Sequence, residues 1–258
     1  MSFAKKLGNI YTKLNTSFED INSALTENGY SKSTNFYTLG NKLRNVIPRG
    51  YNNIVFYMIE RHEAEEIIIP SEFIGKIGSY VFHYYNKLKS VVISNGITSI
   101  ESSAFANCYN LTSVTIPDSV TSIGEGAFYN TAHYLNKGRW SDGILYIGNH
   151  LIDCNANITT YRIRQGTRTI ADSAFSNRIT LTSLTIPDSV TSIGEDAFAN
   201  CTNLDIYLNS IIPPTILSKS AIYSVATIHV PIGSGNTYKS ATNWSSVADK
   251  IVEDIVVE

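Results

Sequence analysis

Apolar and polar residues follow the same order in two distant stretches of the chain. Residues 111–128 read LTSVTIPDSVTSIGEGAF and residues 181–198 read LTSLTIPDSVTSIGEDAF, so sixteen of the eighteen positions are identical. In the first stretch Val114 and Ile116 alternate with polar residues, which predicts a short strand with one buried face. Pro-Asp-Ser at 117–119 then favours a turn, because proline cannot donate to a strand ladder.

The second half of each stretch predicts another extended piece and then a compact turn. Val120 and Ile123 belong to the extended piece, and Gly124 and Glu125 turn the chain again. Ala-Phe at 127–128 fits a short helical turn that places a large ring in the interior. We therefore interpret the repeated pattern as a packing unit.

A spacing of 23 residues relates further copies of this unit. Phenylalanine recurs at 82, 105 and 128, and again at 175 and 198. Phe128 and Phe175 are 47 residues apart, about two periods, which leaves room for one irregular turn. Such a short unit cannot bury its own apolar face, whereas stacked copies share one core. The pattern predicts a repeat solenoid of about seven turns, with a continuous strand ladder and the five rings in one buried column.

The repeated motif can be written L-x-x-(V/L)-x-I-P-x-S-V-x-x-I-G-x-x-A-F-x-x-C, and it resembles the BspA-like class of leucine-rich repeat. The resemblance covers about residues 64–205 and implies a solenoid over 49–205, mostly β with short helical turns. Residues 142–153 resemble a hairpin that replaces a regular turn in this family. Thr167 and Arg178 replace the usual Val and Cys, so we expect looser packing in the turn at 158–178.

Three cysteines, Cys108, Cys154 and Cys201, lie at wide spacing without any CxxC pair. Cys108 and Cys201 both follow Phe-Ala-Asn and therefore take equivalent places about four turns apart. A strand spacing of ~4.8 Å separates these two by ~19 Å, whereas a disulfide needs Cα atoms within about 7 Å. We expect three reduced thiols that fill small apolar spaces.

The first 28 residues carry a different period. Apolar residues recur every seven positions in two sets three residues apart, which is a heptad seam. This helix has two candidate partners, the local segment 36–47 or other copies of itself in a coiled coil. The expected attachment helix uses Leu7, Tyr11, Leu14, Phe18, Ile21 and Leu25. Residues 1–48, taken as an attachment or oligomerisation module, loosely resemble amino-terminal modules of bacteriophage virion proteins.

Residues 206–258 are expected to cap the solenoid, because an open strand ladder invites association. Ile228–Pro231 reads as the last strand, and a short helix over 238–244 places Tyr238 and Trp244 on the end of the stack. The order of a Val-Pro strand followed by Tyr-Lys and Trp also resembles the terminal cap of this repeat family.

Charge and composition exclude several function classes. The net charge of −2 offers no basic face for nucleic acid and no polybasic membrane anchor. No apolar run reaches the ~18 residues of a spanning helix. The start of the chain lacks the continuous apolar core of a signal peptide, which predicts synthesis in a cytoplasm without export by that route.

No catalytic motif and no zinc spacing occurs, so no enzyme activity, metal or cofactor is expected. Glu125, Asp172 and Glu195 take equivalent positions in their turns, which we interpret as a solvated face, the alternative being a carboxylate ladder that binds calcium.

Two surface features are candidates for partner binding. Tyr84, Tyr85, Tyr109 and Tyr129 lie just after buried phenylalanines, with Tyr134 nearby, and tyrosine suits recognition surfaces. The alternative is that these rings only cover the stack. Arg162, Arg164 and Arg168 are expected to form one exposed basic strip for an acidic protein or glycan, or else a solvated face.

These features predict a non-enzymatic structural and interaction protein. The N-terminal resemblance favours a bacteriophage virion component, in a tail fibre, baseplate or capsid appendage, that presents the repeats to a protein or glycan. Its N-terminal helix would join other virion proteins or form a homo-oligomer. The alternative is a BspA-like adhesin or effector at a bacterial cell surface.

Overall fold

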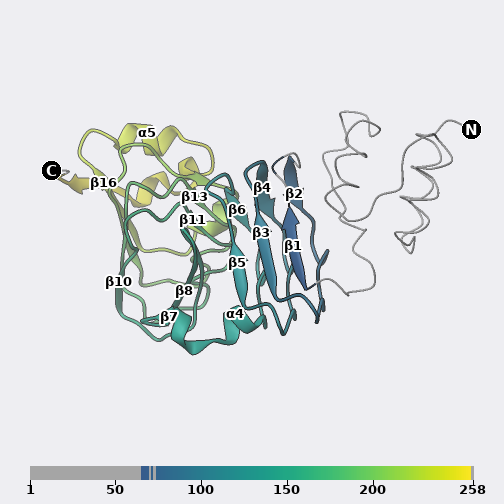
Figure 1. The fold of residues 1–258 in the computed structure, drawn as a ribbon. Coiled ribbons are helices and arrows are strands. Elements are labelled where there is room, and N and C mark those ends of the chain that lie inside the picture. The colour runs from purple at the N-terminus through teal and green to yellow at the C-terminus, as the bar shows by residue number, and fades with distance from the viewer. Residues whose placement is uncertain (1–64, 70, 72–73, 257–258) are drawn as a thin grey trace, which may run out of the picture.

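A computed structural model of the protein describes residues 65–256 except 70, 72 and 73. The predictions made for residues 1–48 therefore lie outside the described residues. The described chain winds as a solenoid in which each regular turn contributes one strand to each of two sheets. Figure 1 shows β1, β3 and β5 side by side in the N-terminal half, and α5 at the opposite end.

The N-terminal half contains two three-stranded parallel sheets, in the orders β1-β3-β5 and β2-β4-β6. Their strands are β1 (Glu66–Ile69), β2 (Gly75–Ile77), β3 (Ser90–Ile93), β4 (Ile97–Ile100), β5 (Ser113–Thr115) and β6 (Ser122–Ile123). Ser90 aligns with Ser113 and Val91 with Val114, so successive strands follow the 23-residue period of the sequence. Inward residues such as Val91 and Ile93 are almost fully buried, as the alternation predicted.

The C-terminal half has a five-stranded sheet, in the order β10-β12-β14-β16-β17, and a six-stranded sheet, β15-β13-β11-β9-β8-β7. The first sheet uses β10 (Thr160–Arg162), β12 (Ser183–Ile186), β14 (Asp205–Leu208), β16 (Thr227–Pro231) and β17 (Ile251–Ile255). The second uses β7 (Trp140–Ser141), β8 (Ile144–Ile147), β9 (His150–Cys154), β11 (Thr169–Ile170), β13 (Ser192–Ile193) and β15 (Thr215–Ile216).

A break separates the two halves, so the prediction of a continuous strand ladder is wrong. The edge of β5 is covered by helix α4 (Ala132–Leu135) and the 3-10 helix η2 (Lys137–Arg139). The amide of His133 donates to the carbonyl of Leu111 at 2.7 Å. The Arg139 guanidinium donates at 3.3 Å to the carbonyl of Thr112, which the next strand of a regular ladder would use. The antiparallel pair β8–β9 then replaces a regular turn. This confirms the predicted hairpin.

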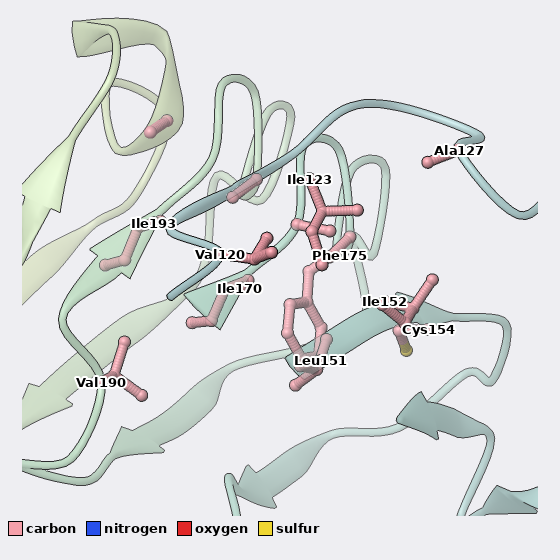
Figure 2. Packing of buried hydrophobic residues seen from close by; sticks show 14 of the residues in the cluster. Val120, Ile123, Ala127, Leu151, Ile152, Cys154, Ile170, Phe175, Val190 and Ile193 are labelled. Atoms are coloured by element: carbon pink, nitrogen blue, oxygen red, sulfur yellow. The ribbon is translucent and has the colours of Figure 1, made fainter. Parts of the chain in front are cut away.

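The apolar core continues across the break. The five predicted phenylalanines are at most 1% exposed. Their ring contacts form two groups, 82–105–128 and 175–198, with centroids 4.8–5.6 Å apart. At the break the amide of Cys154 donates to Ala174 at 2.9 Å, as the amide of Phe105 donates to Ala127 at 2.8 Å. Cys154 thus takes the place of a phenylalanine and interrupts the expected column. Figure 2 shows Phe175 between Ile123, before the break, and Leu151 of β9.

All three cysteines are free and buried, as predicted. The thiols of Cys108 and Cys201 donate to the carbonyls of Phe82 and Phe175, at 2.9 and 3.1 Å. Burial raises the pKa of Cys108 to about 12, so its thiol remains neutral at physiological pH. The substituted Thr167 is also fully buried, and its hydroxyl donates to the backbone carbonyl of Arg164 at 2.7 Å.

The cap closes the C-terminal end, with helices η3 (Lys219–Ala221), α5 (Gly235–Ser240) and η4 (Trp244–Lys250). Tyr238 and Trp244 are buried and meet edge to face at 5.1 Å, as the sequence predicted for these two rings. The Tyr238 hydroxyl donates to Ser210 and the Trp244 indole donates to Pro214, both at 2.8 Å. The predicted strand at Ile228–Pro231 is present in β16, but β17 follows it and is the last strand.

No helix in the described ranges has the length and hydropathy needed to cross a bilayer.

Candidate functional site

Four side chains on the loops after β2 and β4 form one exposed aromatic cluster, which we call the tyrosine patch: Tyr80, His83, Tyr84 and Tyr109. The His83 ring lies 5.4 Å from Tyr80 and 4.2 Å from Tyr84, and Tyr84 lies 6.4 Å from Tyr109. The three tyrosines are 47–60% exposed. Single tyrosines at a surface are ordinary, but a contiguous group offers contact area at low entropic cost.

The side chain of Asn107 links residues of the patch through hydrogen bonds. Its side-chain amide nitrogen lies 2.9 Å from Nε2 of His83. Its oxygen accepts from Asn130 at 3.0 Å, and the Tyr109 hydroxyl lies 3.4 Å from the same oxygen. The patch is therefore fixed by side chains of two successive turns.

Two tyrosines of the patch have backbones in the left-handed region. The φ angle is 61° at Tyr80 and 60° at Tyr84. Asparagine occupies the position of Tyr84 in the later turns, at 107, 130, 177 and 200. The position of Tyr80 is filled by smaller residues, Ser103, Gly126, Ser173 and Asp196, all with positive φ. Asparagine and glycine tolerate this conformation better than tyrosine does. The fold alone thus gives no reason for tyrosine at these two places.

The predicted tyrosine set divides in the structure. Tyr84 and Tyr109 belong to the patch, whereas Tyr129 meets Tyr134 edge to face at 5.5 Å beside the break. Tyr85 is only 3% exposed, which corrects the expectation that it shares the binding face. Tyr80 and His83 were missed, because only the fold brings the loop before Phe82 against the loop after it.

The three predicted arginines are all exposed, but two of them have partners within the chain. The Arg164 guanidinium lies 3.9 Å from the centre of the Tyr146 ring and donates to the carbonyl of Gly148. Arg168 forms an ion pair with Asp118 at 3.6 Å. Arg162 forms neither a cation–π contact nor an ion pair with a described residue. In the parallel pair β10–β12 it aligns with Thr185. Two of the arginines thus attach the hairpin and the turn after it to their neighbours.

A pocket of about 440 Å³ lies at the break, and we call it the break pocket. Its wall carries three carboxyl groups, those of Glu125, Asp153 and Asp172, and three tyrosines, Tyr80, Tyr129 and Tyr134. The Tyr134 hydroxyl donates to Asp153 at 2.6 Å, and the amide of Cys154 donates to the other oxygen at 2.7 Å. Burial raises the pKa of Asp153, although these two hydrogen bonds act in the opposite direction.

Asp172 has the clearest perturbation in the pocket. Burial is the main cause that raises its pKa to about 6, and the negative charges of Glu195, Glu101 and Asp196 add to the effect. One carboxyl oxygen accepts from the amide of Glu195 at 2.9 Å. The sequence pattern placed Glu125, Asp172 and Glu195 on a solvated face, whereas the structure partly buries Asp172 in the pocket wall.

Among the described residues, no group of three or more His, Cys, Asp or Glu could hold a metal ion. The expected attachment residues, from Leu7 to Leu25, lie outside the described ranges.

Residues 75–205, just over half of the chain, match the family model of the BspA type leucine rich repeat region in six copies. The chain belongs to this family. Its members share an interaction fold, and a search of curated proteins returned no match.

Solved structures similar to this BspA-type chain include other leucine-rich repeat proteins. The Treponema pallidum leucine-rich repeat protein is 16% identical, with coverage of 76% of this chain and 88% of that chain and a TM-score of 0.34. A cell surface protein from Faecalibacterium prausnitzii is 24% identical, with coverage of 65% and 67% and a TM-score of 0.28. The pneumococcal vaccine antigen PcpA is 17% identical, with coverage of 78% and 69% and a TM-score of 0.29. Because these TM-scores lie below 0.5, the superpositions add nothing to the family assignment.

Proposed function

We propose that this BspA-type repeat protein is a non-enzymatic interaction module that binds a protein or glycan partner through the tyrosine patch. The observation that carries the proposal is the left-handed backbone of Tyr84, at a position that the later turns fill with Asn, and Tyr80 has the same conformation where other turns have Ser, Gly or Asp. A residue that strains the backbone is retained where it serves something other than the fold. Exposed aromatic rings are the side chains that contribute most at binding surfaces.

The proposal makes stability and binding respond in opposite directions. Tyr84→Asn should raise the free energy of unfolding by up to about 1 kcal/mol, because asparagine fits the left-handed conformation. Loss of the exposed Tyr84 ring should remove little packing from the core. Chemical denaturation of wild type and variant measures this difference. If Tyr84→Asn instead destabilises the protein, the ring covers the stack and the proposal fails.

Contact with a partner is tested by photo-crosslinking. A benzophenone side chain at position 84 or 109 should form covalent adducts with proteins or polysaccharides of the producing cell or particle. The same side chain at Tyr223, which is 63% exposed in the cap, is the matched control. If all three positions form adducts equally, or if positions 84 and 109 form none, the tyrosine patch is not the binding surface.

We further propose that residues 1–48 attach the module to a larger assembly. The heptad seam of Leu7, Tyr11, Leu14 and Phe18 supports this role. We favour a bacteriophage virion as the assembly, in its tail fibre, baseplate or capsid appendage, and a bacterial cell surface is the second candidate. On the outer strand face, the guanidinium of Arg162 would bind an acidic group of the partner.

Mass spectrometry of purified particles, and protease treatment of intact cells, distinguish the two locations. A chain that starts at residue 49 should remain folded and monomeric in light scattering but fail to join its assembly. Normal incorporation of this truncated chain would show that attachment lies elsewhere.

A further inference from the structure

The break pocket occurs once in the described chain, because it forms where α4 and the β8–β9 hairpin replace a regular turn. Its wall combines residues of two regular turns, Tyr80 and Glu125, with Tyr134 and Asp153 from the insert. Asp172 closes the pocket from the turn after the hairpin, and its amide donates to the carbonyl of Ile123 at 2.9 Å. The pocket is thus built by the join between the two halves of the solenoid.

The charge of this wall has one sign. Three carboxyl groups line the pocket, and no Lys, Arg or His is among the described residues that do so. Arg178 is the cation that acts on Asp153 from nearby, but it is outside the lining and forms no ion pair within 4 Å with a described residue. Lys76 lies 3.4 Å from Glu101, so the carboxylate next to the pocket already has a cation of its own. Arg178 thus offsets part of the effect of Glu125 on Asp153, whereas the charges that act on Asp172 are all negative.

The lining also decides which kind of cation fits. The carboxyl groups do not converge as metal ligands do, since no described group of three could hold an ion. Tyrosine rings attract organic cations through their π faces, and Tyr80 and Tyr129 are half exposed at the pocket. A volume of about 440 Å³ lies within the range for small organic groups.

From this geometry we infer that the break pocket binds an organic ammonium group, such as a lysine side chain, between the carboxylates of Glu125, Asp153 and Asp172 and the tyrosine rings. The cation would add a positive charge beside these carboxylates while its methylene groups contact the rings. The pocket shares Tyr80 with the tyrosine patch, but Tyr84 and Tyr109 do not line it, so variants at these two residues test the patch without changing the pocket wall.

The pocket also predicts how binding depends on pH. Asp172 has a pKa of about 6, raised by burial and by Glu195, Glu101 and Asp196, so it is charged at pH 7.5 and mostly neutral at pH 5. The affinity for an ammonium ion should therefore fall as the pH is lowered from 7.5 to 5. A site that used only exposed carboxylates with ordinary pKa values would keep most of its affinity at pH 5.

The test titrates the full chain with N-acetyl-lysine methylamide, and with the uncharged norleucine analogue as the matched probe. Backbone NMR shifts near Tyr129 and Asp172 should change saturably with the lysine probe alone. Glu125→Gln with Asp172→Asn should weaken binding by about fivefold or more, because two charges are lost. The side-chain oxygen that remains at position 172 in this variant can still accept from the amide of Glu195, which protects the fold. Asp249→Asn, an exposed change in the cap, should leave the affinity unchanged.

Tetramethylammonium chloride forms a second arm of the experiment. Tighter binding of this ion than of the lysine probe would assign the site to quaternary ammonium groups, and the reverse order would assign it to lysine. The inference is overturned if neither cation gives a saturable shift, if norleucine binds as well as lysine, or if the double variant binds like wild type.

Discussion

At the scale of single residues, the buried phenylalanines carry the packing that the repeats were expected to share. Phe128 is fully buried and stacks on Phe105 with centroids 5.4 Å apart and planes 3° from parallel. Its neighbour Tyr129 is half exposed. Adjacent aromatic residues thus face opposite environments, and truncation should affect them very differently.

Phe128→Ala should lower the free energy of unfolding by about 3–5 kcal/mol, because it removes a buried ring and leaves a cavity between turns. Tyr129→Ala is the matched control and should cost about 1 kcal/mol or less. Urea denaturation followed by circular dichroism measures both. Similar losses for the two variants would contradict the assignment of Phe128 to the core.

At the scale of the turn, the structure explains why glycine follows isoleucine at positions 124 and 194. A Cβ atom at Gly124 would lie 2.3 Å from the backbone nitrogen of Ser102 in the preceding turn. At Gly194 the same atom would lie 2.4 Å from the nitrogen of Asp172. The glycine is needed because successive turns approach closely, and the amide of Gly124 donates to Ile100 at 2.7 Å.

Gly124→Ala should therefore destabilise strongly, by about 2 kcal/mol or more, because the backbone of one turn must shift. Gly78 takes the same place in the first described turn, where the nearest atom of a described residue to an added Cβ is Val81 Cγ2 at 3.3 Å. Gly78→Ala should cost much less. Thermal unfolding of the two variants makes the comparison, and equal shifts in Tm would contradict close stacking as the cause.

At the scale of the whole molecule, the solenoid consists of two halves joined at the break and closed by the cap. Trp244 and Tyr238 cover the core at the C-terminal end, and β16 and β17 extend the sheet beyond β14. Removing these elements would expose both the apolar core and the hydrogen-bonding edge of β14.

A chain that ends at residue 226 should aggregate or form oligomers, because its last sheet edge is open. A chain that ends at residue 255 retains all described strands and helices and is the control. Size-exclusion chromatography with light scattering distinguishes them. A monomeric, fully folded chain ending at 226 would show that β16, β17 and the aromatic pair are dispensable.

The candidate sites were predicted less well than the fold. Tyr84 and Tyr109 follow buried phenylalanines, so their exposure could be predicted from the position of Phe82 and Phe105 in the repeat. Tyr80 and His83 could be included only with the loop conformation known, in particular the φ of 61° at Tyr80. The three arginines of the expected basic strip are exposed, but only the structure shows that Arg164 contacts Tyr146 of the hairpin and that Arg168 pairs with Asp118 across the break.

The sequence alone determined the repeat unit, its 23-residue period and the burial of each phenylalanine, because these depend on periodic apolar positions that every copy shares. It also determined the hairpin and the two aromatic residues of the cap. Only the tertiary structure decided that the strand ladder breaks after β5, since α4 bonds to the end of that turn while the turn at 169–172 bonds to Ile123 of β6 and pairs with the hairpin. The break pocket follows from this arrangement: Asp153 and Asp172 line it with Glu125 through contacts between turns that no local pattern encodes.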